Sequence, residues 1–217
     1  MKKNTLIAIL IGVFAIVIFL VVATIISNED RDELLSNVSE EETKFKEEYE
    51  VLNIAKTPDG REYPKVKIPS DNKIKYTSVA EIINIMENGG NAVVYFGEST
   101  CLYCRSAVQV LIDTAKTTDL EVIYYLQHDE VDIDDDYNKL MDMMGDYYLS
   151  VNEETDEKRI TIPLVIFIAD GNIVSSNIGT LFSQTDPLTP LDDSQIAGLS
   201  EIYLYGIKDV LGINFSD

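Results

Sequence analysis

Two cysteines, Cys101 and Cys104, are the only thiols in the chain, and they stand three residues apart. The stretch before them, residues 91–97, is apolar, β-branched and aromatic, which predicts a short buried strand that breaks at Gly97. The cysteines then begin a predicted helix. Residues three apart on a helix lie on one side of it, close enough for a disulfide. This arrangement favours a redox-active dithiol.

The position of Cys101 at the start of the helix predicts that it is the reactive thiol. Unpaired backbone N–H groups and the helix dipole favour an anion there, so the thiolate should be stabilised and its pKa lowered. Arg105 should add to this effect, and Cys104, one turn deeper, is placed to close the ring.

The same two cysteines could instead form a structural cross-link or half of a zinc site. Zinc sites generally use four ligands, and the chain offers two cysteines and one histidine, His128. A disulfide across so short a loop removes little entropy from the unfolded chain. Both alternatives are therefore weaker than redox chemistry, and we expect no metal and no other cofactor.

The N-terminal region, residues 1–27, has the pattern of a membrane anchor. The run from Leu6 to Ile26 carries no charge, and at about 1.5 Å per residue it spans roughly 31 Å as a helix, the thickness of a bilayer core. A cleaved signal peptide is the alternative, but its apolar region would be shorter and no small-x-small cleavage site follows. Lys2 and Lys3 predict a cytoplasmic N-terminus, which places the rest of the chain outside the cytoplasm.

The charge of the chain argues against two classes of partner. The formal net charge is −21 at pH 7 over 217 residues, and such a charge repels nucleic acid and anionic membrane surfaces. A strongly solvated exterior is the simplest explanation of this acidity. An extracytoplasmic compartment permits disulfides, yet both thiols stand in one pair, which favours reaction over structure.

We expect residues 28–72 to form an acidic tether that contains a helix and an extended segment. Residues 39–42 match a capping box, which predicts a helix that continues to about Leu52. This helix lacks the sustained heptads of a coiled coil, so packing against the domain is favoured over a dimer zipper. The segment 63–68 is bracketed by prolines, which allows it at most an edge position in a sheet.

Strands and helices alternate over residues 73–217, and this predicts a single α/β domain. The expected elements, in chain order, are strand 74–76, helix 79–88, strand 92–96, helix 101–116, strand 121–126, helix 137–148, strands 164–169 and 172–176, and helix 193–211. Such alternation predicts a central sheet, parallel at first, with helices on both faces. The Asp170-Gly171 turn predicts a hairpin that adds an antiparallel edge.

Two motifs carry a resemblance to a known family: the CxxC at 101–104 after a strand, and the proline of segment 161–163 before a hairpin. With them, residues 73–211 resemble the thioredoxin superfamily, in particular membrane-anchored thioredoxin-like proteins of Gram-positive bacteria. The resemblance implies a thioredoxin-like fold in which Pro163 is cis and faces the dithiol. It also implies that Ile162 offers backbone groups to a bound peptide.

The chain departs from the family pattern in several ways, and two of them concern the site. No proline stands between the cysteines, so Leu102 and Tyr103, which we expect to contact substrate, leave open whether the site oxidises, reduces or isomerises. Tyr95 stands where thioredoxins keep a buried acid, so another group must accept the proton of the resolving thiol. Glu98 is the nearest candidate in sequence, and with Arg105 we expect it to tune the thiol pKa.

An acidic loop imitates the start of a calcium-binding EF-hand with Asp132, Asp134 and Asp136. However, Tyr137 stands at the sixth position, where the motif has glycine, and Met143 at the twelfth, where it has glutamate. A solvated acidic loop is therefore favoured over a calcium site.

Taken together, these features predict a single-pass membrane protein whose extracytoplasmic thioredoxin-like domain exchanges thiols and disulfides with protein substrates. Cys101 attacks and Cys104 resolves. A separate partner, such as an integral membrane electron carrier or a soluble thiol oxidant, must reset the dithiol. The main alternative is a non-catalytic interaction or accessory module at the cell surface. A copper chaperone is a weaker hypothesis than either of these, because His128 is poorly placed in the sequence to serve as a ligand.

Overall fold

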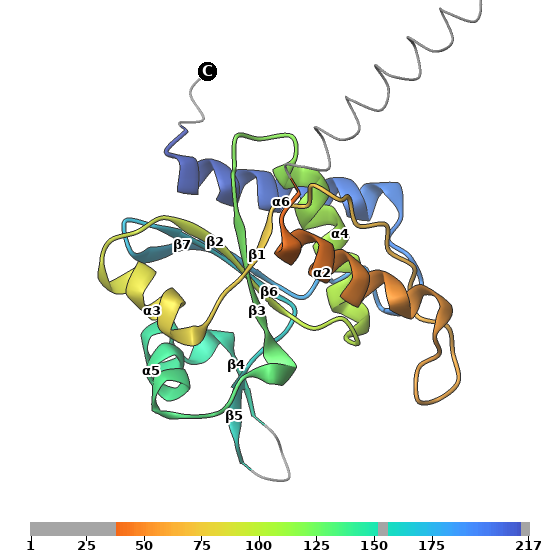
Figure 1. Ribbon diagram of the computed structural model, residues 1–217, viewed down its shortest axis with the longest axis horizontal. Coiled ribbons are helices and arrows are strands. Elements are labelled where there is room, and N and C mark those ends of the chain that lie inside the picture. Colours follow the sequence, from red (N-terminus) through yellow and green to blue (C-terminus); the bar gives the residue numbers. More distant parts are fainter. Residues whose placement is uncertain (1–37, 152–155, 214–217) are drawn as a thin grey trace, which may run out of the picture. The chain divides into compact units, whose positions relative to one another are not determined.

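A computed structural model of the chain describes residues 38–151 and 156–213 (Figure 1). The chain divides into two units, Met1–Ser39 and Glu40–Asp217. The predicted membrane anchor at 1–27 lies outside the described residues. In the part of the chain that the structure describes, no helix is both long enough and apolar enough to span a membrane.

The central sheet of the second unit has five strands in the order β1-β3-β2-β6-β7. Its strands are β1 (Ile74–Tyr76), β2 (Ala92–Gly97), β3 (Ile123–Gln127), β6 (Leu164–Ala169) and β7 (Asn172–Ile178). β3 pairs parallel with β1 and β2, whereas β6 runs antiparallel to both β2 and β7. The prediction of a parallel sheet with an antiparallel hairpin at its edge is confirmed.

Helices cover both faces of this sheet (Figure 1). The first core cluster contains side chains of α2 (Glu40–Glu50), α4 (Leu102–Ala115) and α6 (Asp193–Leu211), and the second contains those of α3 (Val79–Glu87) and α5 (Asp135–Met144). Successive side chains of a strand point to opposite faces. Val93 and Tyr95 of β2 therefore join the first cluster, while Val94 and Phe96 join the second.

The N-terminal part of the described chain is built into the first core. Phe45 and Tyr49 of α2 are fully buried there, so this helix packs on the domain as predicted. A short 3₁₀ helix, η1 (Val51–Ile54), follows it. The segment 63–68 forms no strand, yet Val66 and Ile68 are also buried in the first core. Residues of the predicted tether thus complete the core of the α/β unit.

The described boundaries agree with the predicted ones to within two residues, except at the end of α5. This helix ends at Met144 rather than at Tyr148. Gly145 follows with a φ of 88° and donates its N–H to the carbonyl of Met141, which closes the helix. The residues after Gly145, which the prediction included in the helix, form the separate 3₁₀ helix η3 (Asp146–Tyr148).

Two short strands and one further 3₁₀ helix were not predicted. β4 (Leu149–Val151) and β5 (Lys158–Ile160) form a separate antiparallel pair, and η2 (His128–Glu130) follows β3. Each is only three residues long, and most side chains of β4 and β5 are exposed. Such strands carry too few apolar residues to produce a recognisable alternation.

Candidate active site

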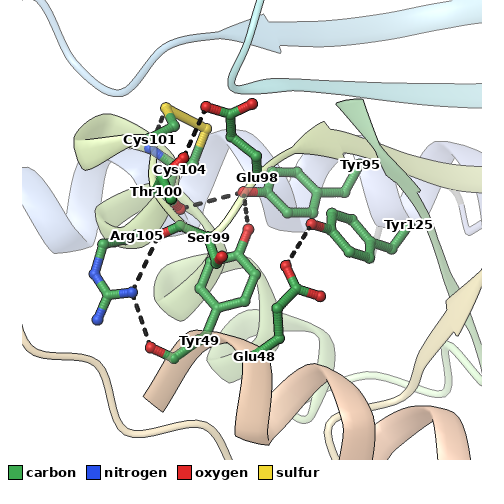
Figure 2. Close-up of a disulfide and its surroundings, with 10 residues drawn as sticks. All are labelled: Glu48, Tyr49, Tyr95, Glu98, Ser99, Thr100, Cys101, Cys104, Arg105 and Tyr125. Atoms are coloured by element: carbon green, nitrogen blue, oxygen red, sulfur yellow. Dashed lines mark hydrogen bonds between the residues drawn. A yellow bond between two sulfur atoms is a disulfide. The ribbon is translucent and has the colours of Figure 1, made fainter. Parts of the chain in front are cut away.

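Cys101 and Cys104 form a disulfide at the N-terminal end of α4, with their Cα atoms 5.1 Å apart (Figure 2). Cys101 is the N-cap residue of the helix and has an extended backbone, so Cys104 lies in the first turn. The loop 98–100 connects it to the end of β2. The strand, the turn and the helix therefore bring the two thiols together as the spacing predicts.

The two cysteines differ in their exposure to solvent. Cys104 is fully buried in the first core, whereas Cys101 is only partly buried. The backbone N–H of Cys104 donates a hydrogen bond of 3.2 Å to the Sγ of Cys101. This donor and the N-terminus of α4 favour negative charge on Cys101 once the disulfide opens. The arrangement suits Cys101 for attack and Cys104 for resolution.

A cavity of about 660 Å³ lies next to the dithiol helix. Three of the predicted substrate-binding residues, Tyr103, Ile162 and Pro163, line it, whereas Leu102 does not. The Ile162–Pro163 peptide bond is cis, as the family resemblance implies. None of the described side chains that line the cavity is charged. The cavity is therefore an uncharged surface on a strongly acidic protein.

Two aromatic residues on the cavity wall were missed in the sequence. Tyr147 lies in η3 and Phe182 lies in the loop after β7. Phe182 is fully exposed and Tyr147 is 76% exposed. Exposed aromatic rings around an apolar hollow are typical of a binding surface. Each ring is a single aromatic residue in an irregular segment, so hydrophobic periodicity offered no signal for it.

The Arg105 side chain points toward residues 49–64, which precede the central sheet in the sequence. It is fully buried, and its guanidinium reaches away from the disulfide toward Tyr49 and Ser99 (Figure 2). It donates hydrogen bonds to the carbonyls of Pro64 (2.7 Å), Tyr49 (2.9 Å) and Ser99 (3.2 Å), and to the side-chain oxygen of Asn53 (2.8 Å). Burial lowers the pKa of Arg105, but a guanidinium stays charged at neutral pH. Its predicted effect on the thiol pKa stays a prediction.

Glu98 lies between β2 and the dithiol. Its carboxylate accepts a hydrogen bond of 3.0 Å from the Thr100 hydroxyl. Burial lowers the pKa of His128, and the negative charge of Glu98 opposes this shift. The fold thus brings together an acid and an imidazole that are distant in sequence, and the Nε2 atom of His128 is buried without a hydrogen-bond partner among the described residues.

Tyr95 connects the dithiol to the N-terminal helix. Its hydroxyl donates a hydrogen bond of 3.3 Å to the backbone carbonyl of Cys104. The same hydroxyl lies 3.0 Å from the hydroxyl of Tyr49 on α2, and both tyrosines are fully buried (Figure 2). The strand position where thioredoxins keep a buried acid therefore carries a hydroxyl that reaches Cys104.

An acid belongs to the same aromatic cluster, but it comes from α2. Tyr125 stacks on Tyr95 with ring centroids 5.5 Å apart, and its hydroxyl donates to the Glu48 carboxylate at 3.1 Å. Tyr76 donates to the other oxygen of Glu48 at 2.6 Å. Burial raises the pKa of Glu48, and these two hydrogen bonds partly offset the shift. Sequence proximity favoured Glu98 and could not reveal Glu48.

Metal binding has no support in the described part of the chain, where no cluster of three His, Cys, Asp or Glu side chains could hold an ion. In the acidic loop, the Asp134 carboxylate accepts a hydrogen bond from the N–H of Tyr137 and caps α5. A structural role thus accounts for at least one of the carboxylates that imitate an EF-hand.

The sheet, its flanking helices and the CxxC disulfide are together compatible with a thioredoxin-like fold. No protein-family model matches the chain, and no curated protein matches it. What the fold and the site define is an α/β protein with a disulfide-forming CxxC, an arrangement compatible with a redox role.

Proposed function

We propose that this protein is a thiol–disulfide oxidoreductase of the thioredoxin-like class that acts on protein substrates. The observation that carries the proposal is the pairing of a partly exposed Cys101 at the N-terminus of α4 with a fully buried Cys104. A purely structural disulfide needs no such difference in exposure. An attacking thiol must be accessible, whereas a resolving thiol reacts only inside the protein.

The exchange transfers two electrons and proceeds in two steps. The Cys101 thiolate attacks one sulfur of a substrate disulfide, and the other substrate sulfur leaves as a thiolate that takes up a proton. Cys104 then loses its proton and attacks Cys101. The Cys101–Cys104 disulfide forms and the second substrate sulfur leaves, so the substrate is reduced and the dithiol is oxidised. Oxidation of a substrate dithiol follows the same steps in reverse.

The cavity next to the dithiol helix supports a peptide substrate. Tyr103 from the CxxC, the cis-proline segment of Ile162 and Pro163, and Phe182 from the loop after β7 all line it. An uncharged, partly aromatic surface of this kind accommodates apolar side chains next to a substrate cysteine. We therefore assign the substrate segment to this cavity.

We further propose that the domain works outside the cytoplasm and is held at the membrane by residues 1–27. The uncharged run after Lys2 and Lys3 supports this location. The chain has no second dithiol. A separate electron carrier in the membrane, or a soluble thiol oxidant, therefore restores the working state of Cys101 and Cys104.

Replacing Phe182 with serine is expected to slow exchange with a peptide disulfide. Removal of an exposed ring that packs on the substrate should lower kcat/KM by about five- to tenfold. The rate with hydroxyethyl disulfide, which is too small to span the cavity, should not change. Stopped-flow kinetics of the reduced protein with both substrates measure the two rates.

Ile54→Ser is the matched control, because Ile54 is 92% exposed and does not line the cavity. Equal rates for Phe182→Ser and Ile54→Ser with the peptide would remove the cavity from the substrate path. The alternative of a non-catalytic interaction module has its own signature. It predicts no exchange by the wild-type protein and full peptide affinity after Cys101→Ser.

A further inference from the structure

Residues 49–53 hold two consecutive residues of the dithiol helix, Cys104 and Arg105, in place. The carbonyl of Cys104 receives the Tyr95 hydroxyl, which in turn meets Tyr49 of α2. The guanidinium of Arg105 donates to the carbonyl of the same Tyr49 and to the side chain of Asn53. The side chain and the backbone of Tyr49 thus serve adjacent positions of α4 (Figure 2).

The hydrogen bonds that link Tyr49, Tyr95 and the Cys104 carbonyl are all donated in one direction. A phenol carries a single proton, and the proton of Tyr95 is given to the Cys104 carbonyl. The hydrogen bond between the two tyrosines must therefore be donated by Tyr49. A hydroxyl that accepts one hydrogen bond becomes a better donor of another. Tyr49 therefore strengthens the bond that holds the Cys104 backbone.

The packing leaves the Tyr95 hydroxyl no other position. Tyr95 is fully buried, and its ring lies directly against the end of β2. A Cβ atom at Gly97 would collide with the hydroxyl and the ring of Tyr95. Tyr49 is held as firmly, with its ring 4.5 Å from that of Phe45 between centroids. Both donors are thus preorganised by the core.

We propose that Tyr49 is a positioning residue of the dithiol, which acts through Tyr95 to keep Cys104 in place when the disulfide opens. This inference rests on the proposed function, and it makes residues 40–54 a working part of the redox site. The attack of Cys101 on a substrate does not need this support. The return attack of Cys104 does, because its sulfur must reach Cys101 inside the protein.

Tyr49→Phe tests the proposal, since it removes the donor and keeps the ring. We expect the Cys104 attack on a Cys101–glutathione mixed disulfide to slow by about three- to tenfold, the range that one hydrogen bond covers. Alkylation of Cys101 by iodoacetamide should keep its rate. Tyr95→Phe should slow the same step at least as much, because it removes both hydrogen bonds. Mixed-disulfide decay is followed by mass spectrometry after acid quenching.

Tyr203→Phe is the matched control. Its hydroxyl, on α6, is buried in the same core. Asn177 lies near this hydroxyl, but the two do not form a hydrogen bond of normal geometry. Gly97→Ala disturbs the same hydrogen bonds in a different way, because it displaces the Tyr95 hydroxyl and leaves both phenols present. Urea unfolding of each variant reports stability separately from the rate of resolution.

Slower resolution in Tyr49→Phe and Tyr95→Phe, with Tyr203→Phe at the wild-type rate, supports the positioning role. Equal resolution rates in all three variants would overturn it, whatever their stabilities. A wild-type protein that never forms the glutathione mixed disulfide would instead remove the proposed function itself.

Discussion

Replacing Arg105 with methionine is expected to destabilise the protein by about 3–5 kcal/mol. The substitution keeps the length of the side chain but removes the donor to the buried carbonyls of Pro64 and Tyr49 and to the half-buried carbonyl of Ser99. The Asn53 side-chain oxygen loses the same donor and keeps its hydrogen bond from the N–H of Val66. These acceptors lie in residues 49–64 and in the loop before Cys101. Loss of the hydrogen bonds therefore weakens the attachment of both segments to α4. Urea denaturation followed by circular dichroism measures the change.

Arg61→Met is the control for this prediction. Arg61 forms an ion pair with Asp59, and both side chains are more than half exposed. Exposed pairs of this kind contribute little to stability, because solvent screens the two charges. An Arg105→Met protein as stable as Arg61→Met would show that the buried guanidinium does not hold the segment to the dithiol helix.

In cells, Cys104→Ser is expected to accumulate mixed disulfides with substrate proteins, and Cys101→Ser is expected to accumulate far fewer. The first variant keeps the partly exposed thiol at the start of α4 and removes the only group that can release the substrate. The second keeps only a fully buried thiol. Non-reducing electrophoresis after acid quenching, followed by mass spectrometry of the trapped species, compares the two strains.

A serine hydroxyl at the buried position of Cys104 carries its own cost, so Cys104→Ala serves as a second trapping variant. The reduced wild-type protein should also be alkylated first on Cys101 near neutral pH. Equal alkylation of the two thiols, together with no trapped species in either Cys104 variant, would contradict exchange with proteins and favour an interaction module.

Local sequence patterns were sufficient to predict most of the fold. The apolar runs of β2 and β6 and the Asp170-Gly171 turn each act over a few residues, and the structure has the expected elements there. β4 and β5 escaped prediction because short, mostly exposed strands leave no hydrophobic alternation.

The environment of the dithiol was less accessible from sequence, because it depends on contacts between distant segments. The adjacency of Cys104 to Arg105 suggested that the guanidinium faces the thiols, but the backbone carbonyls that bind it come from residues 49–64 and Ser99. The sequence indicated only that Tyr95 replaces a buried acid, whereas the structure places its hydroxyl between Cys104 and Tyr49. Only the folded chain brings these groups together.

The equilibrium of the Cys101–Cys104 pair with a glutathione buffer at pH 7 tests the central claim most directly. The fractions of dithiol and disulfide are read by alkylation and mass spectrometry, while circular dichroism monitors the fold. We expect reversible reduction of the folded protein at a potential above about −300 mV, the upper bound of most structural disulfides. A pair that is reduced only below this potential, or only after the chain unfolds, would contradict a redox-active site.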